Sequence, residues 1–240
     1  MLSSKFTNWK WFLKGILYLI IYAIIALYGY SVVSEIYLTS PRTLFTPIDY
    51  IIPFIGWFAI FYVFIYFPFY LFGIGYFTFI KREKADRFML SIFLIYAISF
   101  LIYILFPVRM IRPDPESLPT DFLSQVMRKY YEHDPPLNCF PSLHAATSTF
   151  VAYHFYKEDK KFGYLAWIIA FLVMTATLFV RQHVIIDEIA GFLLAIVSAK
   201  VGEKYIPLTE ADEKIPIWRW IFTIVLWILV TAFLISGYIP

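Results

Sequence analysis

Long apolar runs constrain this chain more than any other feature of its sequence. Hydrophobic residues make up 61% of the 240 residues and charged residues only 15%. The apolar residues come in stretches of about 20, the length that crosses a hydrocarbon core of roughly 30 Å. They do not show the ten-residue alternation typical of a transmembrane β-barrel. The sequence therefore predicts an all-α fold, a polytopic membrane helical bundle.

Seven runs are long enough to be candidate spans. They cover residues 13–33, 50–80, 88–108, 140–157, 163–180, 184–201 and 216–238. The second run contains Pro53, Pro68, Gly73 and Gly75. Because no polar turn interrupts it, we expect one kinked or tilted helix there. No cleavage site clearly follows the first run, so we expect a retained helix instead of a removed signal peptide.

Basic residues predict the orientation. With a cytoplasmic N-terminus, fourteen of the 20 Lys and Arg residues fall in inner segments, which is the excess expected on the cytoplasmic side. We therefore expect an integral protein of the cell (cytoplasmic) membrane. The basic residues are scattered along that edge, so the sequence does not support nucleic-acid binding. Cys139 is the single cysteine, which excludes an internal disulfide and a cysteine-based metal site.

The longest polar stretch runs from Arg109 to Cys139. Within residues 121–132, apolar residues recur at helical spacing, which predicts a short amphipathic helix at the membrane surface. These residues are Phe122, Leu123, Val126, Met127 and Tyr130. The helix is interpreted either as a lid or gate for lipid entry or as a plain surface anchor, and the sequence does not choose between the two.

Two histidines stand at the edges of apolar runs. His144 opens the fourth run, and His183 directly precedes the sixth, with Asp187 four residues further on. Ionisable groups in such segments are costly to bury and mark functional sites. Asp187 lies one helical turn from His183, so its carboxylate can accept an imidazole N–H and leave the other ring nitrogen free to attack. We predict His183, His144 and Asp187 as catalytic residues.

Positive charge and helix-start groups accompany these histidines. Arg181 is close to His183, and Arg109 and Arg112 at the outer end of the third run can converge on the same place. A guanidinium matches phosphate oxygens. Ser142 falls in the first turn of the fourth helix, where free backbone N–H groups favour an anion. Arg112, Arg109, Arg181 and Ser142 are therefore predicted to bind phosphate.

These parts suit phosphoryl transfer. His183 would attack phosphorus to give a phosphohistidine, and His144 would protonate the leaving oxygen. The arginines, the Ser142 hydroxyl and the backbone N–H groups would stabilise the charge that develops. A zinc site wants three or more protein ligands, so we predict neither a metal nor another cofactor.

Plainer interpretations exist for each residue. The His183–Asp187 pair could be a helix-packing contact, Ser142 a simple helix-start hydroxyl, and Arg109 or Arg112 an interfacial snorkelling residue. We assign no function to His133 or His154. Glu188 is expected to face water or a neighbouring helix.

Three segments resemble signatures of the type-2 phosphatidic acid phosphatase superfamily. Residues 138–145, NCFPSLHA, resemble the second signature in its PSLH form. Residues 177–191 resemble the third in its QHxxxD form, and Arg112-Pro113 resembles the end of the first. These variants are similar to the branch that includes inositol phosphorylceramide synthases.

The resemblance implies a domain organisation. It covers about residues 45–202, and the seventh helix lies outside the six-helix core of that family. We accordingly expect an N-terminal helix with the first outer loop over residues 1–44 and a catalytic core over 45–202, with its outer loop at 109–139. A cytoplasmic loop with a C-terminal transmembrane helix is expected over 203–240.

Two positions depart from the family pattern. The lysine of the first signature falls at Leu105, and the arginine of the third falls at Thr177. We expect Arg109 and Arg181 to supply the missing charge in a pocket of different shape. The departures bear on the choice of substrate more than on the reaction class.

The resulting hypothesis is an integral membrane lipid phosphatase or phosphotransferase that works through phosphohistidine, with its active site outside the cytoplasm. One alternative is a synthase that transfers a phosphoryl-headgroup to a lipid alcohol. Another is a non-enzymatic lipid-binding or transport protein on the same fold. The expected partners are a membrane lipid substrate and the bilayer, and homo-oligomerisation is left open.

Overall fold

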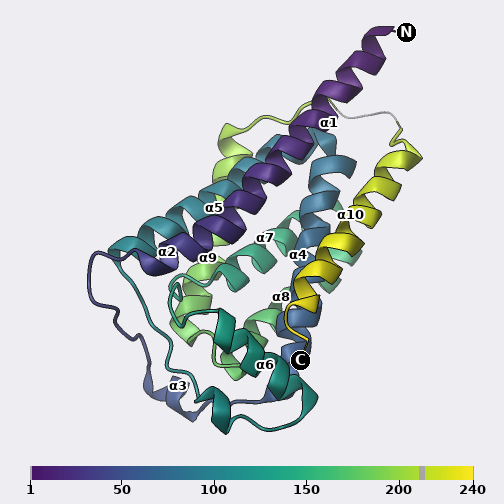
Figure 1. The fold of residues 1–240 in the computed structure, drawn as a ribbon. Helices are drawn as coiled ribbons and strands as arrows, with labels where there is room; N and C mark the ends of the chain where they lie inside the picture. The colour runs from purple at the N-terminus through teal and green to yellow at the C-terminus, as the bar shows by residue number, and fades with distance from the viewer. Residues whose placement is uncertain (1, 211–213, 240) are drawn as a thin grey trace.

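The computed structural model describes residues 2–210 and 214–239, and it is a helical bundle (Figure 1). This confirms the predicted all-α membrane fold. Residues 211–213 of the expected cytoplasmic loop lie outside the described residues. The α-helices are α1 (Leu2–Ala23), α2 (Tyr30–Glu35), α3 (Pro47–Ile51), α4 (Tyr66–Gly75), α5 (Ala85–Leu105), α6 (Phe122–His133), α7 (Leu143–Glu158), α8 (Lys160–Phe179), α9 (Ile185–Tyr205) and α10 (Ile217–Ser236).

Five helical segments of the described chain are long and apolar enough to span a membrane: Trp9–Glu35, Gly56–Ile80, Arg82–Leu105, Lys160–Phe179 and Ile217–Ser236. The other two predicted spans correspond to α7 and α9. Helix α7 has only 16 residues and is buried along nearly its whole length, and α9 carries ionisable residues near both ends. These two helices pack against each other and α7 also packs against α8. Helix α7 therefore lies in the interior of the bundle, whereas α9 keeps an exposed apolar face that includes Leu193 and Val197.

The second span begins later than the sequence predicted. Thr46 and Asp49 cap a separate short helix, α3, since the Asp49 Oδ2 accepts from the Thr46 backbone N–H at 2.7 Å. Pro53 then disfavours helical backbone at Ile52, which is extended. The spanning helix starts at Gly56 and is continuous to Ile80. Two π-helical stretches, Ile60–Ile65 and Tyr76–Ile80, flank α4, and they are the expected irregularities of a helix near proline and glycine.

Close packing of α7 against α9 sets the position of both histidine segments. Gly191 permits this approach, because a Cβ at that position would lie 2.3 Å from the Ser142 carbonyl oxygen. The backbone N–H of Ser142 also donates to the Asp187 carbonyl at 3.0 Å. Small residues at helix interfaces allow such short separations in membrane proteins. The start of α7 is thereby fixed beside the start of α9.

Helix α6 forms where the sequence predicted the amphipathic helix. Asp121 caps it by accepting from the Ser124 backbone N–H at 3.1 Å, and Val126 and Met127 are fully buried. Its apolar face packs on the bundle, against Ala59, Tyr62, Val63, Ala176 and Val180. The helix therefore covers one end of the bundle, with its apolar face on the protein (Figure 1).

Helix α10 packs along α4. Trp227 Nε1 donates to the Pro68 carbonyl at 2.8 Å, and the Tyr238 ring just beyond the helix stacks on Tyr130 of α6 with 4.7 Å between centroids. The C-terminal helix is thus fixed to the bundle and to the helix that covers its end.

Candidate active site

The predicted catalytic side chains meet at the end of the bundle that α6 covers. His144 Nδ1 lies 3.3 Å from His183 Nε2, and His183 Nδ1 lies 3.5 Å from Asp187 Oδ2. The second distance is that of an ion pair longer than an ordinary hydrogen bond. His183 and Asp187 are buried and His144 is half-buried. The three side chains form a chain of contacts in the order His144, His183, Asp187.

The carboxylate of Asp187 is aimed by its own helix start. Its Oδ2 accepts from the Val184 backbone N–H at 3.0 Å, which satisfies one of the free donors of the first turn of α9. That oxygen is also the one that faces His183. A neutral His183 with its proton on Nδ1 therefore keeps a lone pair on Nε2, and His144 Nδ1 is then the donor of the His–His contact.

The charges around His183 shift the pKa of its imidazole. Burial alone lowers the pKa of this imidazole by disfavouring the charged form, but the carboxylates of Asp187 and Glu188 outweigh it. The pKa of His183 is therefore raised above its usual value. A carboxylate partner has this effect because it stabilises the imidazolium.

The loop before His183 is held from several sides. Arg181 adopts a left-handed backbone, with φ 51°, and its Nη1 donates to the carbonyls of Asp49 at 2.7 Å and Ile52 at 3.1 Å. Asp49 Oδ1 in turn accepts from the Ile185 backbone N–H at 3.0 Å. Fixing a reactive side chain in this way lowers the entropy cost of reaching the reacting geometry.

Arg112 is the arginine that reaches the histidines' surroundings. Its guanidinium donates to the Asp134 carboxylate at 2.7 Å and to the Gln182 side-chain oxygen, and it lies over the Tyr131 ring, 4.9 Å from the centroid. The side chain is only 7% exposed. A buried guanidinium next to the residue that precedes His183 is well placed to face an anion bound at that histidine.

The other predicted phosphate-binding residues are placed differently. The Arg109 side chain is exposed, while Arg181 is committed to the carbonyls of the α3 segment. Ser142 caps α7, since its Oγ accepts from the Ala145 backbone N–H at 3.2 Å. The structure thus brings Arg112 to the histidines, keeps Ser142 at the helix start beside them, and directs Arg109 and Arg181 elsewhere.

The two departures from the family pattern lie in contrasting surroundings. Leu105 is 52% exposed on the outside of α5. Thr177 is fully buried, and its carbonyl accepts from the backbone N–H groups of Gln182 at 2.8 Å and His183 at 3.3 Å. Neither position supplies a cation to the site.

Glu188 was expected to face water or a neighbouring helix, and the expectation of water is wrong. It is 4% exposed, and both carboxylate oxygens lack a hydrogen-bond partner among the described residues. The hydroxyls of Ser142 and Thr177 are nearby; the Ser142 Oγ accepts from the Ala145 backbone N–H, and the Thr177 hydroxyl donates to the Met174 carbonyl. Packing of α9 against α7 encloses this carboxylate. The polar start of α9 has no periodicity from which this burial could have been predicted.

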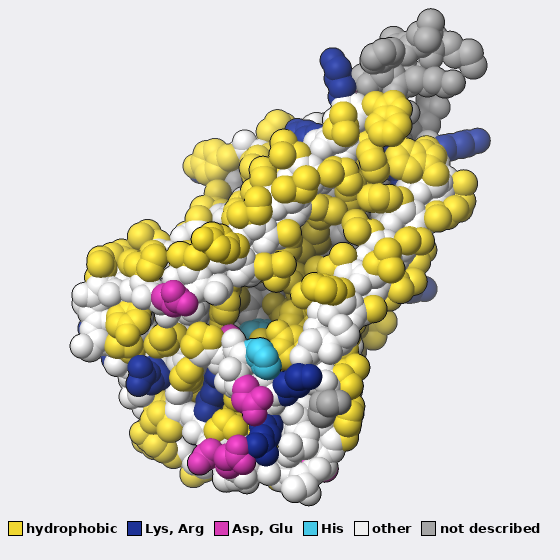
Figure 2. Space-filling view, in the orientation of Figure 1, with side chains coloured by type: hydrophobic (Ala, Val, Ile, Leu, Met, Phe, Trp, Pro, Cys, Tyr) yellow, Lys and Arg dark blue, Asp and Glu magenta, His cyan; other side chains and the backbone are white. Residues whose placement is uncertain are grey.

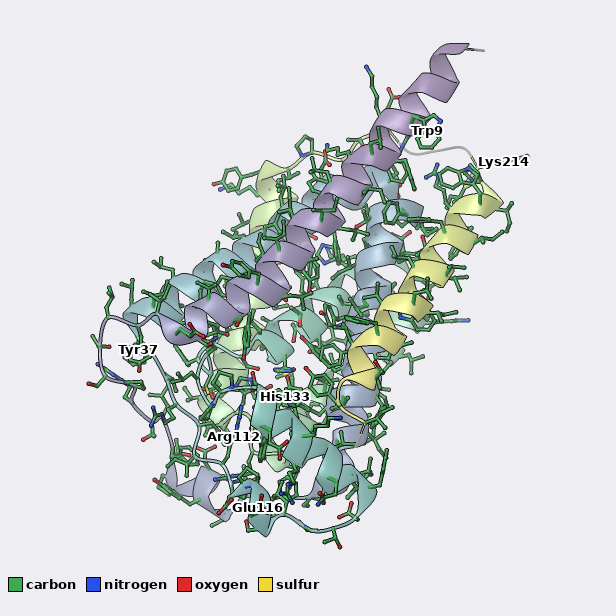
Figure 3. The ribbon with its side chains drawn as sticks, viewed as in Figure 1. Trp9, Tyr37, Arg112, Glu116, His133 and Lys214 are labelled. Carbon is green, nitrogen blue, oxygen red and sulfur yellow. The ribbon has the colours of Figure 1, made fainter. Side chains whose placement is uncertain are left out.

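Sequence reasoning also missed Asp134, Gln182 and His133. Asp134 and Gln182 orient Arg112, and His133 at the end of α6 lines the cavity beside His144 and His183. Figure 3 shows Arg112 and His133 at the same end of the molecule. Of these three residues, only Gln182 could have been identified from the sequence, because it lies between Arg181 and His183 in the signature.

A cavity of about 260 Å³ opens onto His144 and His183. Its wall is largely aromatic, with Tyr30, Tyr66, Phe67, Tyr70, Tyr96, Tyr130 and Tyr238 among its residues. His144, His183 and Asp134 supply polar groups to it. A mostly apolar cavity with a few convergent polar groups is the usual form of a small-molecule site. Within residues 2–210 and 214–239, no cluster of three or more His, Cys, Asp or Glu is arranged to hold a metal ion.

Comparisons with known proteins bear on this site. The model of the PAP2 superfamily matches residues 88–208, half of the chain, and that range includes Arg112, His144, His183 and Asp187. An uncharacterized protein of Methanocaldococcus jannaschii is 32% identical over 130 residues, which cover 53% of this chain and 52% of the relative. The chain thus spans about half the length of that relative. No solved structure matches this chain. By the family match, this chain belongs to the PAP2 superfamily.

Proposed function

We propose that this protein is an integral membrane lipid phosphatase or phosphotransferase, which cleaves a lipid phosphate or pyrophosphate ester through a phosphohistidine. The contact chain His144–His183–Asp187 beside Arg112 carries the proposal. Membership of the PAP2 superfamily supports a phosphatase or phosphotransferase reaction.

The first step follows from the tautomer that Asp187 favours. The free Nε2 of His183 attacks phosphorus, an N–P bond forms, and the bond from phosphorus to the leaving oxygen breaks. His144 enters this step as the imidazolium, gives its Nδ1 proton to that oxygen and becomes neutral, and the oxygen departs as an alcohol or as a phosphate. Arg112 faces the charge that develops on the phosphoryl oxygens.

The second step returns the site to its starting state. Water, or the hydroxyl of an acceptor, attacks phosphorus and the N–P bond breaks. His144 is neutral after the first step, and its Nδ1 takes the proton of the attacking oxygen. His183 recovers its lone pair, and inorganic phosphate or the transferred phosphoester leaves.

The substrate must separate the two histidines. Their facing nitrogens are 3.3 Å apart, whereas an attacking nitrogen and phosphorus alone need about 3–3.5 Å before reaction. Substrate binding therefore replaces the His–His contact with a phosphoryl group between the rings. Because the loop of His183 is held at both ends, we expect the His144 ring to move.

Trapping the covalent species tests this proposal. Purified protein is mixed with radiolabelled lipid phosphates and pyrophosphates and quenched in alkali, where phosphohistidine survives, or in acid, where it does not. We expect alkali-stable label that is absent from His183→Ala and present in His144→Ala. Full turnover by His183→Ala, or label of equal intensity in that variant, would refute the mechanism.

The charge balance of the site favours one second candidate, the headgroup-transferring synthase. Asp134, Asp187 and Glu188 surround His183, while the family's two further cations are replaced by Leu105 and Thr177. A phosphodiester carries one negative charge where a monoester carries up to two, so it suits a site with fewer cations. Product analysis with and without a lipid alcohol separates the candidates: free phosphate as the main product would exclude the synthase.

We further propose that the site faces the outside of the cell membrane, which rests on the excess of basic residues in the inner segments. Intact cells expressing the protein should hydrolyse an added water-soluble, short-chain lipid phosphate that does not cross the bilayer. Activity that appears only after the cells are opened would reverse this orientation.

A further inference from the structure

A second, apolar cavity of about 380 Å³ lies between α1, α4 and α10. Its wall includes Ile20 and Ala23 of α1, Ile74 of α4, and Leu226 and Val230 of α10. Figure 2 shows this face hollowed between two ridges of hydrophobic side chains, with a histidine near the end of the hollow. The hollow, called the groove below, lies between α1 and α10, whose positions are labelled in Figure 1.

The groove adjoins the cavity at the histidines. Ala26, Leu27, Tyr70 and Leu234 line both. An occupant of the groove would therefore reach from the apolar part of the bundle to His144 and His183 without leaving the protein. Annular lipid on an ordinary helix face has no such connection to a polar site.

The far end of the groove is closed by aromatic contacts. Phe12 of α1 meets Trp218 and Phe222 of α10, with 5.4 Å and 5.1 Å between ring centroids. From Phe222 to Leu234 the groove follows α10 for about 18 Å at the 1.5 Å rise of a helical residue. It has the form of a slot, closed at its far end, that can hold one extended apolar chain.

Both walls are fixed to the bundle. Arg219 near the start of α10 is buried and donates to the Phe79 carbonyl at 3.3 Å, and Trp227 bonds to Pro68 further along. On the opposite wall, the Tyr22 and Tyr96 hydroxyls share a hydrogen bond of 3.1 Å. The slot is therefore preformed and does not depend on closure around a ligand.

We propose that this groove binds the acyl or isoprenoid chain of the lipid phosphate, while its phosphoryl group lies between His144 and His183. The inference rests on the proposed function and deepens it, because it assigns a substrate-binding role to α10, a helix beyond the residues that the family model matches. Burial of an apolar chain in an apolar slot contributes binding energy roughly in proportion to the area covered.

Filling the groove tests the proposal. Ala23→Trp places an indole in the slot, and the matched control is Ala97→Trp on the exposed side of α5. For dioleoyl phosphatidate we expect kcat/KM of Ala23→Trp to fall about tenfold or more, the effect of misfit in an apolar pocket. For soluble dihexanoyl phosphatidate it should stay within about twofold, as for a surface change, and Ala97→Trp should alter neither.

The outcomes separate this inference from the proposed function. Equal effects of Ala23→Trp on long and short substrates, or no effect on either, would overturn the groove while the reaction stands. If no lipid phosphate is turned over, native mass spectrometry of both variants in the His183→Ala background decides. Retention of long-chain phosphatidate by the Ala23→Trp form equal to that of the Ala97→Trp form would overturn the groove, and loss confined to the former would support it.

Discussion

His144 Nδ1 and His183 Nε2 face each other at 3.3 Å, so the proposed acid and the proposed nucleophile share one contact before any substrate arrives. Asp187 stands on the far side of His183, 3.5 Å from Nδ1. This order gives the two histidines different roles, since a neutral His183 with its Nδ1 proton toward the carboxylate keeps its lone pair on Nε2.

Removal of His144 should slow two proton transfers by different amounts. With a lipid alkoxide as leaving group, we expect kcat of His144→Ala to fall about 10²–10⁴-fold, the usual contribution of a general acid. p-Nitrophenyl phosphate needs no proton on its leaving oxygen, so its first step should survive while attack by water stays slow. Rapid-mixing kinetics should then show a burst of nitrophenol followed by slow turnover. A uniform loss on both substrates without a burst contradicts the assignment of His144.

The pH dependence of the reaction should report His183. Because its pKa is raised by the nearby carboxylates, the imidazole stays protonated to higher pH, and the rate should increase as pH rises through that pKa. Asp187→Asn removes the anionic partner and lowers the pKa, so the acidic limb of the kcat/KM profile should move to lower pH. The plateau rate should also fall, by about 10³-fold or more, because the tautomer is no longer fixed. A limb that stays in place, measured over a full pH series, would show that another group controls it.

Two arginines three residues apart provide a matched test of phosphate binding. Arg112 is buried against Asp134 and Gln182, whereas the Arg109 side chain is exposed. Arg112→Lys keeps the charge but loses the planar fork, and we expect kcat/KM to fall about 10²-fold, as for loss of one donor to a developing anion. Arg109→Lys should leave it within about twofold. Equal losses in the two variants would remove Arg112 from the site.

Glu188 should cost the fold stability. A buried carboxylate whose oxygens lack partners among the described residues is expensive, by about 1–3 kcal/mol or more. Glu188→Gln keeps the shape without the charge, so we expect a higher unfolding temperature in detergent. Glu203→Gln on the same helix is the control, because Glu203 accepts from the Tyr153 hydroxyl at 2.9 Å and lies 3.5 Å from Lys157; its temperature should stay equal or drop. Destabilisation by Glu188→Gln would mean that the charge is compensated.

The histidine segments were predictable because their geometry is local. A helix start places Ser142 and His144 on one turn. His183 lies just before α9 and not on its face as predicted, but Asp187 in the first turn of α9 still reaches it. The placement of the arginine side chains was not predictable, because it depends on partners that are distant in the sequence. Arg181 turns away through a left-handed residue to bind carbonyls of the α3 segment, and no spacing rule relates position 181 to position 49.

Burial inside the bundle also escaped sequence reasoning. Glu188 follows Asp187 at a helix start, where a carboxylate is ordinary, and only the close approach at Gly191 encloses it. His133 ends an amphipathic helix and is exposed, yet it also lines the cavity. The contact that encloses Glu188 comes from a helix far away in the sequence.

The hydrogen bonds from Arg181 to the carbonyls of Asp49 and Ile52 have a consequence for any attempt to shorten this protein. The family model recognises residues 88–208, and a fragment with those limits keeps every reacting atom of the proposed mechanism. It also discards the carboxylate that holds Ile185 and the carbonyls that hold Arg181, together with both sides of the groove. We expect such a fragment to be inert even where it inserts into a bilayer, so the minimal working enzyme is longer than the part of the sequence that identifies its kind.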